Sequence, residues 1–259
     1  MPRQKSRPEP LPEDELSAMT LRACLIARDA VFNVRDSLAT GSRLAFLAIK
    51  DCEKELDQIE RKIDEQLPGA ITRVGEAKAR ELLACLKFIT DLERIGDLAY
   101  SAVMQLESRR EKLPAADSRQ LVEMASLLCE MLEEVHQGFL TRDLEHAQSV
   151  LKTDPEVDRV CHELFQRHLT APNRGFLKSP RSRTAISSRA MSSADRSHDS
   201  PARKNEDSAP PPSAQNFDIL LAAQALERIG DHAKNLAEEI YSLAEGRSLR
   251  HTTKKLTYS

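Results

Sequence analysis

The chain has 259 residues, of which 31% are charged and 4% aromatic, and it contains no tryptophan. This balance favours helices packed through Leu, Ile and Ala over a sheet protein, and the length suits one large domain or two modest ones. A net charge of −3 gives no reason to expect nonspecific nucleic-acid binding, and no apolar run reaches the roughly 18 residues that span a bilayer.

The beginning of the chain and its cysteines indicate a cytoplasmic protein. Residues 1–12 are polar and proline-rich, which predicts a disordered tail and not a secretory signal peptide. The five cysteines are widely spaced, without a C-x-x-C pair, and are typical of reduced core residues. We therefore expect a cytoplasmic location.

Residues 13–112 predict a first repeat of three helices. Acidic residues 13–15 suit the positive end of a helix, and Gly41 suits a helix end. Pro68 and Gly69 are expected to stop the second helix. The expected helices cover about 13–39, 42–67 and 75–110. Long helices joined by short turns form an antiparallel bundle.

The third expected helix carries the sequence Leu92-Glu93-Arg94-Ile95-Gly96-Asp97 within an apolar seam. Glu93 and Asp97 lie four residues apart, so they share one strip of the helix, which we place roughly opposite the seam and facing solvent. Two like charges at this spacing cost about 0.2–0.5 kcal/mol. A glycine inside a helix costs about 1 kcal/mol relative to alanine. The motif therefore calls for an explanation other than helix stability.

Residues 113–250 predict a second repeat, with helices at about 116–139, 142–169 and 215–245. Three residues of the second helix recur 94 positions later in the fifth: Glu60, Ile63 and Asp64 match Asp154, Val157 and Asp158. Because proline favours the first turn of a helix, Pro155 predicts a kink or a split in the fifth helix.

The second repeat is interrupted by residues 171–213, which are rich in Ser, Pro and Arg and carry a net charge of about +4. Asp64 precedes Glu93 by 29 residues, whereas Asp158 precedes Glu227 by 69, so this segment is an insertion or replaces part of a helix junction. Its polarity predicts disorder. A passive linker is one interpretation, and a phosphorylation site or a site for an anionic partner is the other. Residues 251–259 form a second tail.

The sixth expected helix repeats the motif as Leu226-Glu227-Arg228-Ile229-Gly230-Asp231. Its acidic strip continues at the same four-residue spacing through Asn235 to Glu239, and we place it in solvent as well. One interpretation is a solvated charged face in which Arg94 and Arg228 screen the nearby aspartates. The other is a metal site in each repeat, because hard cations bind carboxylate oxygens. The second copy of the motif favours a shared role.

The stretch from Ala225 to Ile240 closely resembles the signature helix of the PhoU family, whose members are phosphate-signalling proteins made of two three-helix repeats. Thr90 to Ala99 looks like the matching helix of the N-terminal repeat, although Ser101 stands where the second copy has Asn235. The resemblance covers most of residues 14–250. It implies an all-α fold of two tandem three-helix bundles.

The resemblance also implies metal ligands, because E-x-x-x-D pairs bind surface metal clusters in that family. The implied ligands are Glu93 with Asp97 and Glu227 with Asp231, with Asp64 and Asp158 in a supporting role. The implied cofactors are multinuclear clusters, with iron as the first choice and Mn, Mg or Ca as alternatives, since carboxylates accept all of these metals.

The function implied by the resemblance is negative regulation of phosphate uptake and of phosphate-starvation signalling, through metal-dependent protein contacts. The implied partners are the ATPase subunit of a phosphate ABC transporter, the sensor histidine kinase of the phosphate regulon and a second copy in a homodimer. Association with membranes would be peripheral, through these complexes, and no nucleic-acid partner is expected.

Two alternatives come from other classes of protein. A carboxylate-bridged di-iron enzyme is suggested by Glu133-x-x-His136 and Asp143-x-x-His146, but it also needs inward-pointing glutamates on two further helices. Glu93 and Glu227 match these by type, although their strips are expected to point outward. The other alternative is a helical scaffold without metal. Because the chain has no phosphate-binding loop and no nucleophile motif, we do not expect an enzyme.

Deleting residues 171–213 and joining the ends with a short linker should leave the melting temperature nearly unchanged. The segment has too few apolar residues to offset the entropy cost of ordering it. Thermal unfolding followed by circular dichroism checks this. If the deletion unfolded the C-terminal repeat, the segment would have to be part of the fold.

Overall fold

The computed structural model describes residues 13–107, 113–170 and 214–245, and these ranges contain six helices and no strand. The helices are α1 (Glu13–Thr40), α2 (Arg43–Ile71), α3 (Glu76–Glu107), α4 (Ala115–Thr141), α5 (Leu144–Thr170) and α6 (Ala214–Glu245). Within these ranges no helix is long and apolar enough to cross a membrane. The predicted tails 1–12 and 251–259 and the insertion 171–213 lie outside the described residues.

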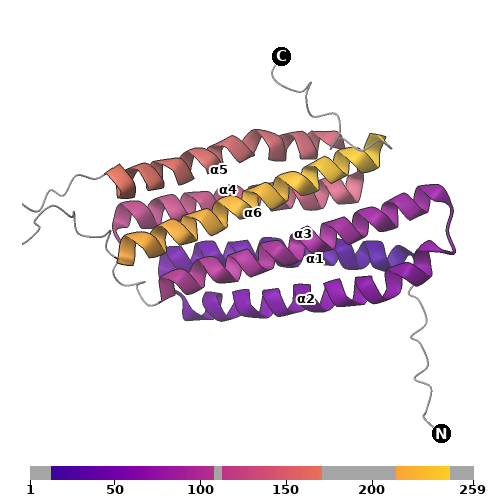
Figure 1. Ribbon diagram of the computed structural model, residues 1–259, viewed down its shortest axis with the longest axis horizontal. Helices are drawn as coiled ribbons and strands as arrows, with labels where there is room; N and C mark the ends of the chain where they lie inside the picture. Colours follow the sequence, from indigo (N-terminus) through magenta and orange to yellow (C-terminus); the bar gives the residue numbers. More distant parts are fainter. Residues whose placement is uncertain (1–12, 108–112, 171–213, 246–259) are drawn as a thin grey trace, which may run out of the picture.

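The six helices form two bundles that pack side by side (Figure 1). Helices α1, α2 and α3 all contact one another, as do α4, α5 and α6, and the bundles meet where α1 packs on α4 and α3 packs on α6. Lys87 pairs with Glu239 and Asp91 with His232, so α3 and α6 run antiparallel. Equivalent helices therefore meet across an approximate two-fold axis, and the predicted fold of two three-helix bundles is confirmed.

A single apolar core runs through both bundles because each helix buries one seam. The seam predicted on α3 is fully buried at Phe88, Leu92 and Ile95. Phe88 also contacts Phe139 of α4, with ring centroids 4.5 Å apart, and so joins the two repeats. Full burial of one such side chain stabilises the fold by about 1.5–3 kcal/mol. All five cysteines are free, and Cys24, Cys85 and Cys161 are buried in this core.

The predicted end of the second helix at Pro68 is wrong, and so is the alternative that the fifth helix splits at Pro155. Helix α2 continues through Pro68 and ends at Ile71, and α5 is one helix that runs through Pro155. A proline inside a helix costs about 3 kcal/mol. In both cases the proline is exposed while apolar neighbours remain on the core side, including Ala70 in α2 and Val157 in α5. Tertiary packing therefore outweighs the local signal.

Neighbouring helices approach the two motif glycines to different distances. A Cβ atom on Gly96 would come within 2.7 Å of Leu56 Cδ1, because α2 passes directly over this position. A Cβ atom on Gly230 would meet nothing closer than 3.6 Å, at Leu128 and Val157. Of the two, therefore, only at Gly96 would an added methyl group force a side chain of a neighbouring helix to move.

Substituting the two glycines separately should give opposite results. Gly230→Ala should stabilise the protein by up to about 1 kcal/mol, because alanine favours the helix and the added methyl group fits. Gly96→Ala gains the same helix propensity but forces the buried Leu56 to move, at a cost of about 1–3 kcal/mol. Urea unfolding of both variants and the parent measures the difference. Gly96→Ala matching or exceeding Gly230→Ala in stability would contradict the close approach of α2.

Candidate functional site

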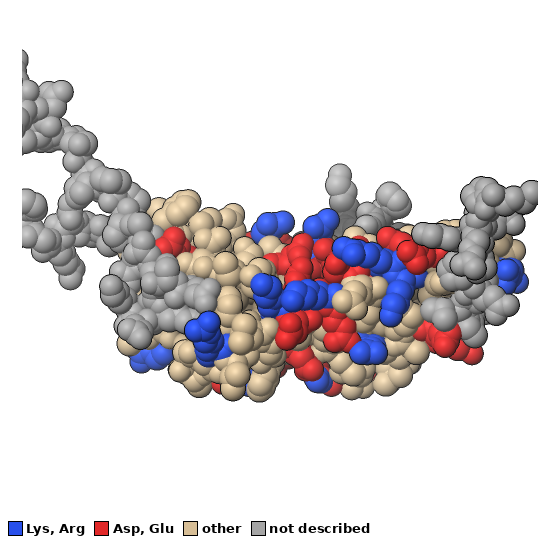
Figure 2. Space-filling model, turned by 90° about the horizontal axis from the view of Figure 1, so that it is seen from below, with Lys and Arg blue, Asp and Glu red and all other residues tan. Residues whose placement is uncertain are grey.

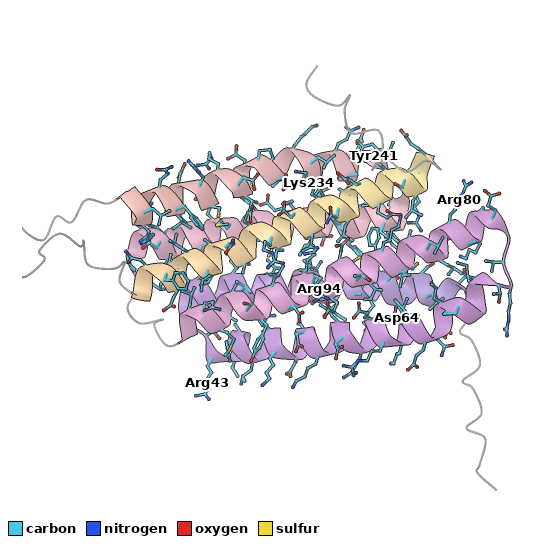
Figure 3. All side chains as sticks on the ribbon, in the orientation of Figure 1. Arg43, Asp64, Arg80, Arg94, Lys234 and Tyr241 are labelled. Carbon is cyan, nitrogen blue, oxygen red and sulfur yellow. The ribbon has the colours of Figure 1, made fainter. Side chains whose placement is uncertain are left out.

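The first acidic cluster lies between α2 and α3 and consists of Glu60 and Asp64 on α2 with Glu93 and Asp97 on α3. Figure 3 shows Asp64 and Arg94 in the region between these two helices. Figure 2, which looks onto the molecule from the α2 side, shows acidic side chains gathered with basic ones near the middle of this face. We call these four carboxylates the α2–α3 cluster.

The carboxylates of the α2–α3 cluster interact with one another. Burial raises the pKa of Glu93, and the charges of Asp97 and Glu60 raise it further, whereas Arg94 opposes the shift. Burial likewise raises the pKa of Glu60, and the charge of Asp64 adds to this effect. The folded protein therefore holds these acids at a distance where their repulsion is felt.

Glu93 has a buried carboxylate oxygen that receives no hydrogen bond from the described residues. This atom is Oε2, and the side chain as a whole is 16% exposed. Arg94 lies 3.5 Å from this oxygen through Nε and 3.4 Å from Asp97 Oδ2 through Nη1, and its own side chain is 58% exposed. The arginine thus gives only partial screening. The prediction that Glu93 faces solvent is wrong, because this carboxylate lies at the edge of the core beside α2.

The second acidic cluster lies between α5 and α6 and consists of Asp154, Asp158, Glu227 and Asp231; we call it the α5–α6 cluster. Burial raises the pKa of Glu227, and the charges of Asp231, Asp158 and Asp154 raise it further. Burial also raises the pKa of Asp158, and Asp154 and Asp231 add to the effect. In both repeats, therefore, burial and neighbouring carboxylates raise the pKa of the motif glutamate.

The structure brings together the six carboxylates named from the sequence, in two groups of three, and adds one at matching positions of each repeat; Asp57 of α2 also acts on Glu93 and Glu60. The added residues are Glu60 and Asp154, which lie four positions before Asp64 and Asp158 on the same helix strips. Their recurrence at a spacing of 94 residues was the signal that identifies them.

The acidic strip of α6 does not continue to Glu239 as predicted. Glu239 is buried, and Lys87 Nζ of α3 donates to both of its carboxylate oxygens at 2.9 Å. A four-residue step turns a helix by about 400°, so the strip drifts by about 40° per step. After three steps from Glu227, the strip has moved from the side of α6 that faces α5 to the side that faces α3.

A groove of about 460 Å³ opens beside the α5–α6 cluster. Asp158 and Glu227 lie at its wall together with Cys161, and its other lining residues are His162, Phe165, Gln166 and Leu169. Burial raises the pKa of the Cys161 thiol to about 11, and the charges of Glu227 and Asp158 contribute. At neutral pH this cysteine is therefore a protonated thiol and a poor nucleophile.

The donor atoms of both clusters fit a hard cation. Within residues 13–107, 113–170 and 214–245, no three His, Cys, Asp or Glu side chains are already arranged as a metal site. The carboxylates would have to turn toward one another to share an ion. The Oε2 atom of Glu93 supports such a role, because it is buried and accepts no hydrogen bond from the described residues, and a cation would satisfy it.

The residues of the di-iron interpretation have other partners. Glu133 accepts a hydrogen bond from Arg28 at 2.5 Å, and His146 contacts Glu134 at 2.7 Å. Glu93 and Glu227 lie at the α2 and α5 sides of their bundles, and the described interior between the helices is apolar. The structure thus does not assemble the inward-pointing ligand set that this interpretation needs.

These features define a class of protein: an all-helical pair of three-helix repeats, each with an acidic cluster between its second and third helices. The PhoU domain model matches residues 20–106, 121–196 and 196–240. The chain therefore belongs to the PhoU family.

Relatives and solved structures agree with this assignment. The chain is 28% identical to a Rhizobium meliloti protein over 90% of this chain and 87% of the relative, and 26% identical to a Caulobacter vibrioides protein over 94% of each. Both are named phosphate-specific transport system accessory protein PhoU homolog. The crystal structure of PhoU from Pseudomonas aeruginosa matches with a TM-score of 0.67 at 21% identity, covering 90% of this chain and 97% of that one. A PhoU structure from Streptococcus pneumoniae matches with a TM-score of 0.66 at 18% identity, covering 91% of this chain and 96% of that one. At these identities the structures show the fold alone.

Neutralising Glu93 should change metal-free stability in the opposite direction to neutralising Glu81. The raised pKa of Glu93 means that the folded state binds its proton more tightly than the unfolded state does. The contribution of this group to the free energy of unfolding is therefore present at acidic pH and is lost as pH rises. Glu93→Gln should therefore be at least as stable as the parent at pH 7, with its relative advantage shrinking toward pH 4. Urea unfolding in the presence of a chelator measures this.

Glu81→Gln is the matched control. Burial tends to raise the pKa of Glu81, but the hydrogen bond from Ser17 and the pairs with Lys78 and Arg142 outweigh it and lower the pKa. Glu81→Gln should therefore lose stability at pH 7, with a loss that shrinks as pH falls. A loss for Glu93→Gln with the same pH dependence would show that Glu93 is a structural ion-pair partner of Arg94.

Proposed function

We propose that this chain is an accessory regulator of phosphate transport, which restrains phosphate uptake and phosphate-starvation signalling through protein contacts. The observation that supports this most strongly is similarity along most of the length of named relatives. The chain spans 87% and 94% of two relatives that are named accessory proteins of the phosphate-specific transport system. The match includes both repeats, so it is not confined to one shared helix.

The proposed contacts depend on metal ions held by the two acidic clusters. In the α2–α3 cluster the ligands would be Glu93 and Asp97 with Asp64 and Glu60. In the α5–α6 cluster they would be Glu227 and Asp231 with Asp158 and Asp154. Bound cations would neutralise repulsion among the carboxylates and link the outer helix of each repeat to its neighbour. Iron is our first choice, with Mn, Mg and Ca as alternatives, because an all-oxygen ligand set accepts each of them.

The proposed partners are the ATPase subunit of a phosphate ABC transporter, the sensor histidine kinase of the phosphate regulon and a second copy of this chain. The position of the clusters supports contact with large partners. Helices α2 and α5 lie on the outer sides of the two bundles, and Asp97 and Asp231 remain partly or fully exposed. We propose contact rather than catalysis, because the relatives are named accessory proteins of a transport system.

Removing the motif carboxylates should remove bound metal. At saturating cation, Glu93→Gln with Asp97→Asn should empty the α2–α3 cluster, and Glu227→Gln with Asp231→Asn the α5–α6 cluster. The quadruple variant should bind neither. Elemental analysis of protein equilibrated with the metal and freed of excess measures this. Equal metal in the parent and the quadruple variant would leave the solvated charged face as the explanation.

A matched control exists on α2 itself. Asp51 and Glu55 are also acids four residues apart, but Glu55 pairs with Arg22 of α1 and neither belongs to a cluster. Asp51→Asn with Glu55→Gln removes as much negative charge as either double variant of the clusters. It should leave the amount of bound metal unchanged. If this variant also lost metal, net charge rather than the cluster would control binding.

The partner proposal is tested by binding of the full chain to the phosphate transporter's ATPase subunit from the same organism. Binding followed by surface plasmon resonance should require Mn²⁺ or iron, disappear with chelator and be lost in the quadruple variant. The Asp51 and Glu55 control should bind like the parent. Undiminished binding by the quadruple variant in chelator would mean that the clusters do not mediate this contact.

A further inference from the structure

The two acidic clusters differ at a charged position on the helices that carry the motif, and on α2 the first also has the ion pair of Asp57 with Arg61, where α5 has Leu151 and Pro155. The four carboxylates of each cluster have a counterpart in the other repeat, and so does the arginine that follows the first glutamate of each motif. Three residues after Asp231, however, the second repeat has Lys234, whereas three residues after Asp97 the first repeat has Tyr100. The repeats thus provide an internal comparison of one cluster with a cation at this motif position and one without it.

Lys234 reaches into the α5–α6 cluster from a partly exposed position, with 42% of its side chain exposed. Its Nζ donates to Asp154 Oδ2 at 2.6 Å, and Asp154 is 4% exposed. The hydrogen bond to Asp154 raises the pKa of Lys234, and the charges of Asp158 and Asp231 raise it further. The ammonium group therefore lies among three of the four carboxylates that would hold a metal ion.

Tyr100 gives the α2–α3 cluster no such cation. Its ring packs against Phe46 of α2, with centroids 6.2 Å apart. Glu60, the counterpart of Asp154, has a pKa raised by burial and by the charge of Asp64, and Glu93 keeps an oxygen without a hydrogen-bond partner. Arg94 is largely exposed and does not reach the buried oxygen in hydrogen-bond geometry. The cation of this cluster is thus an exposed arginine beside Glu93 and Asp97, and no ammonium group of the described residues lies among its carboxylates.

We propose that Lys234 is a built-in counter-cation of the α5–α6 cluster, so that the α2–α3 cluster binds divalent cations more tightly. A divalent ion can enter the α5–α6 cluster only by displacing the ammonium from Asp154 and against its positive charge. The α2–α3 cluster contains no ammonium to displace. This inference rests on the proposed metal binding and adds which cluster is loaded first. The two repeats would then respond to two different ranges of cation concentration.

Comparing the parent protein with the two double variants shows which cluster binds Mn²⁺ more tightly. The full chain is stripped with chelator and titrated with Mn²⁺ by equilibrium dialysis. Glu227→Gln with Asp231→Asn should keep the tighter binding. Glu93→Gln with Asp97→Asn should keep only binding that is weaker by at least about tenfold, as expected for a unit positive charge within a few ångströms of the ion.

Exchanging the distinguishing residue should reverse the order. In the parent background, Lys234→Met should tighten Mn²⁺ binding to the α5–α6 cluster by at least about tenfold, and Tyr100→Lys should weaken binding to the α2–α3 cluster to a similar degree. Lys234→Arg retains the charge and should keep weak binding. Lys87→Met is the control: it removes a lysine of α3 that pairs with Glu239 and lies outside both clusters. It should change the Mn²⁺ affinity of neither cluster.

Thermal unfolding adds a readout that does not depend on dialysis. Lys234→Met leaves Asp154 buried without its partner, so the metal-free variant should melt below the parent, and Mn²⁺ should raise its melting temperature more than that of the parent. If Lys234→Met does not fold, Tyr100→Lys tests the same inference in the other repeat.

Two results would overturn the inference while leaving metal binding intact. One is equal affinity of the two clusters in the parent, and the other is unchanged affinity in both Lys234→Met and Tyr100→Lys. If the parent bound Mn²⁺ at neither cluster, this would instead overturn the metal-binding part of the proposed function itself.

Discussion

The packing of α3 against α6 is the constraint on which the other features depend. Both helices bury a seam in the common core, represented by Leu92 and Ile95 on α3 and by Leu226 and Ile229 on α6. Burying a seam sets the rotation of its helix about its own axis. At about 100° per residue, the motif carboxylates then face the second helix of their own repeat. The residues on the other flank face the partner repeat, where they form the ion pairs that join α3 to α6.

This rotation explains why acids from different helices meet. An i, i+4 pair on one helix is common on protein surfaces and has no necessary function. Here each repeat places two such pairs, one on each of two antiparallel helices, across the same contact. The close approach of Leu56 to Gly96 brings α2 near enough for Glu60 to act on Glu93. A glycine that is unfavourable for an isolated helix therefore serves the helix contact on which the cluster depends.

The approximate two-fold relation of the repeats does not make their sites equivalent. Both clusters contain four carboxylates, but Lys234 compensates one of them and Tyr100 packs as an apolar group in the other. Duplicated repeats keep a common core because the same seams must be buried in each. Positions at the edge of the core are freer to differ, since a lysine and a tyrosine can both cover apolar surface there with their stems or rings. Differences in function between the repeats are therefore expected at such edge positions.

The sequence alone determined the helical class, the two repeats and six of the eight cluster carboxylates, because seam periodicity and a repeated motif are local properties of the chain. It did not determine that α2 passes Pro68 or that α5 passes Pro155, since those outcomes depend on burial against other helices. Nor did it show that Glu239 would be buried against Lys87, because four-residue spacing ignores the drift of a strip around a helix. Only the tertiary structure placed Lys234 on Asp154, because an ion pair between residues 80 positions apart requires the packing of α5 on α6.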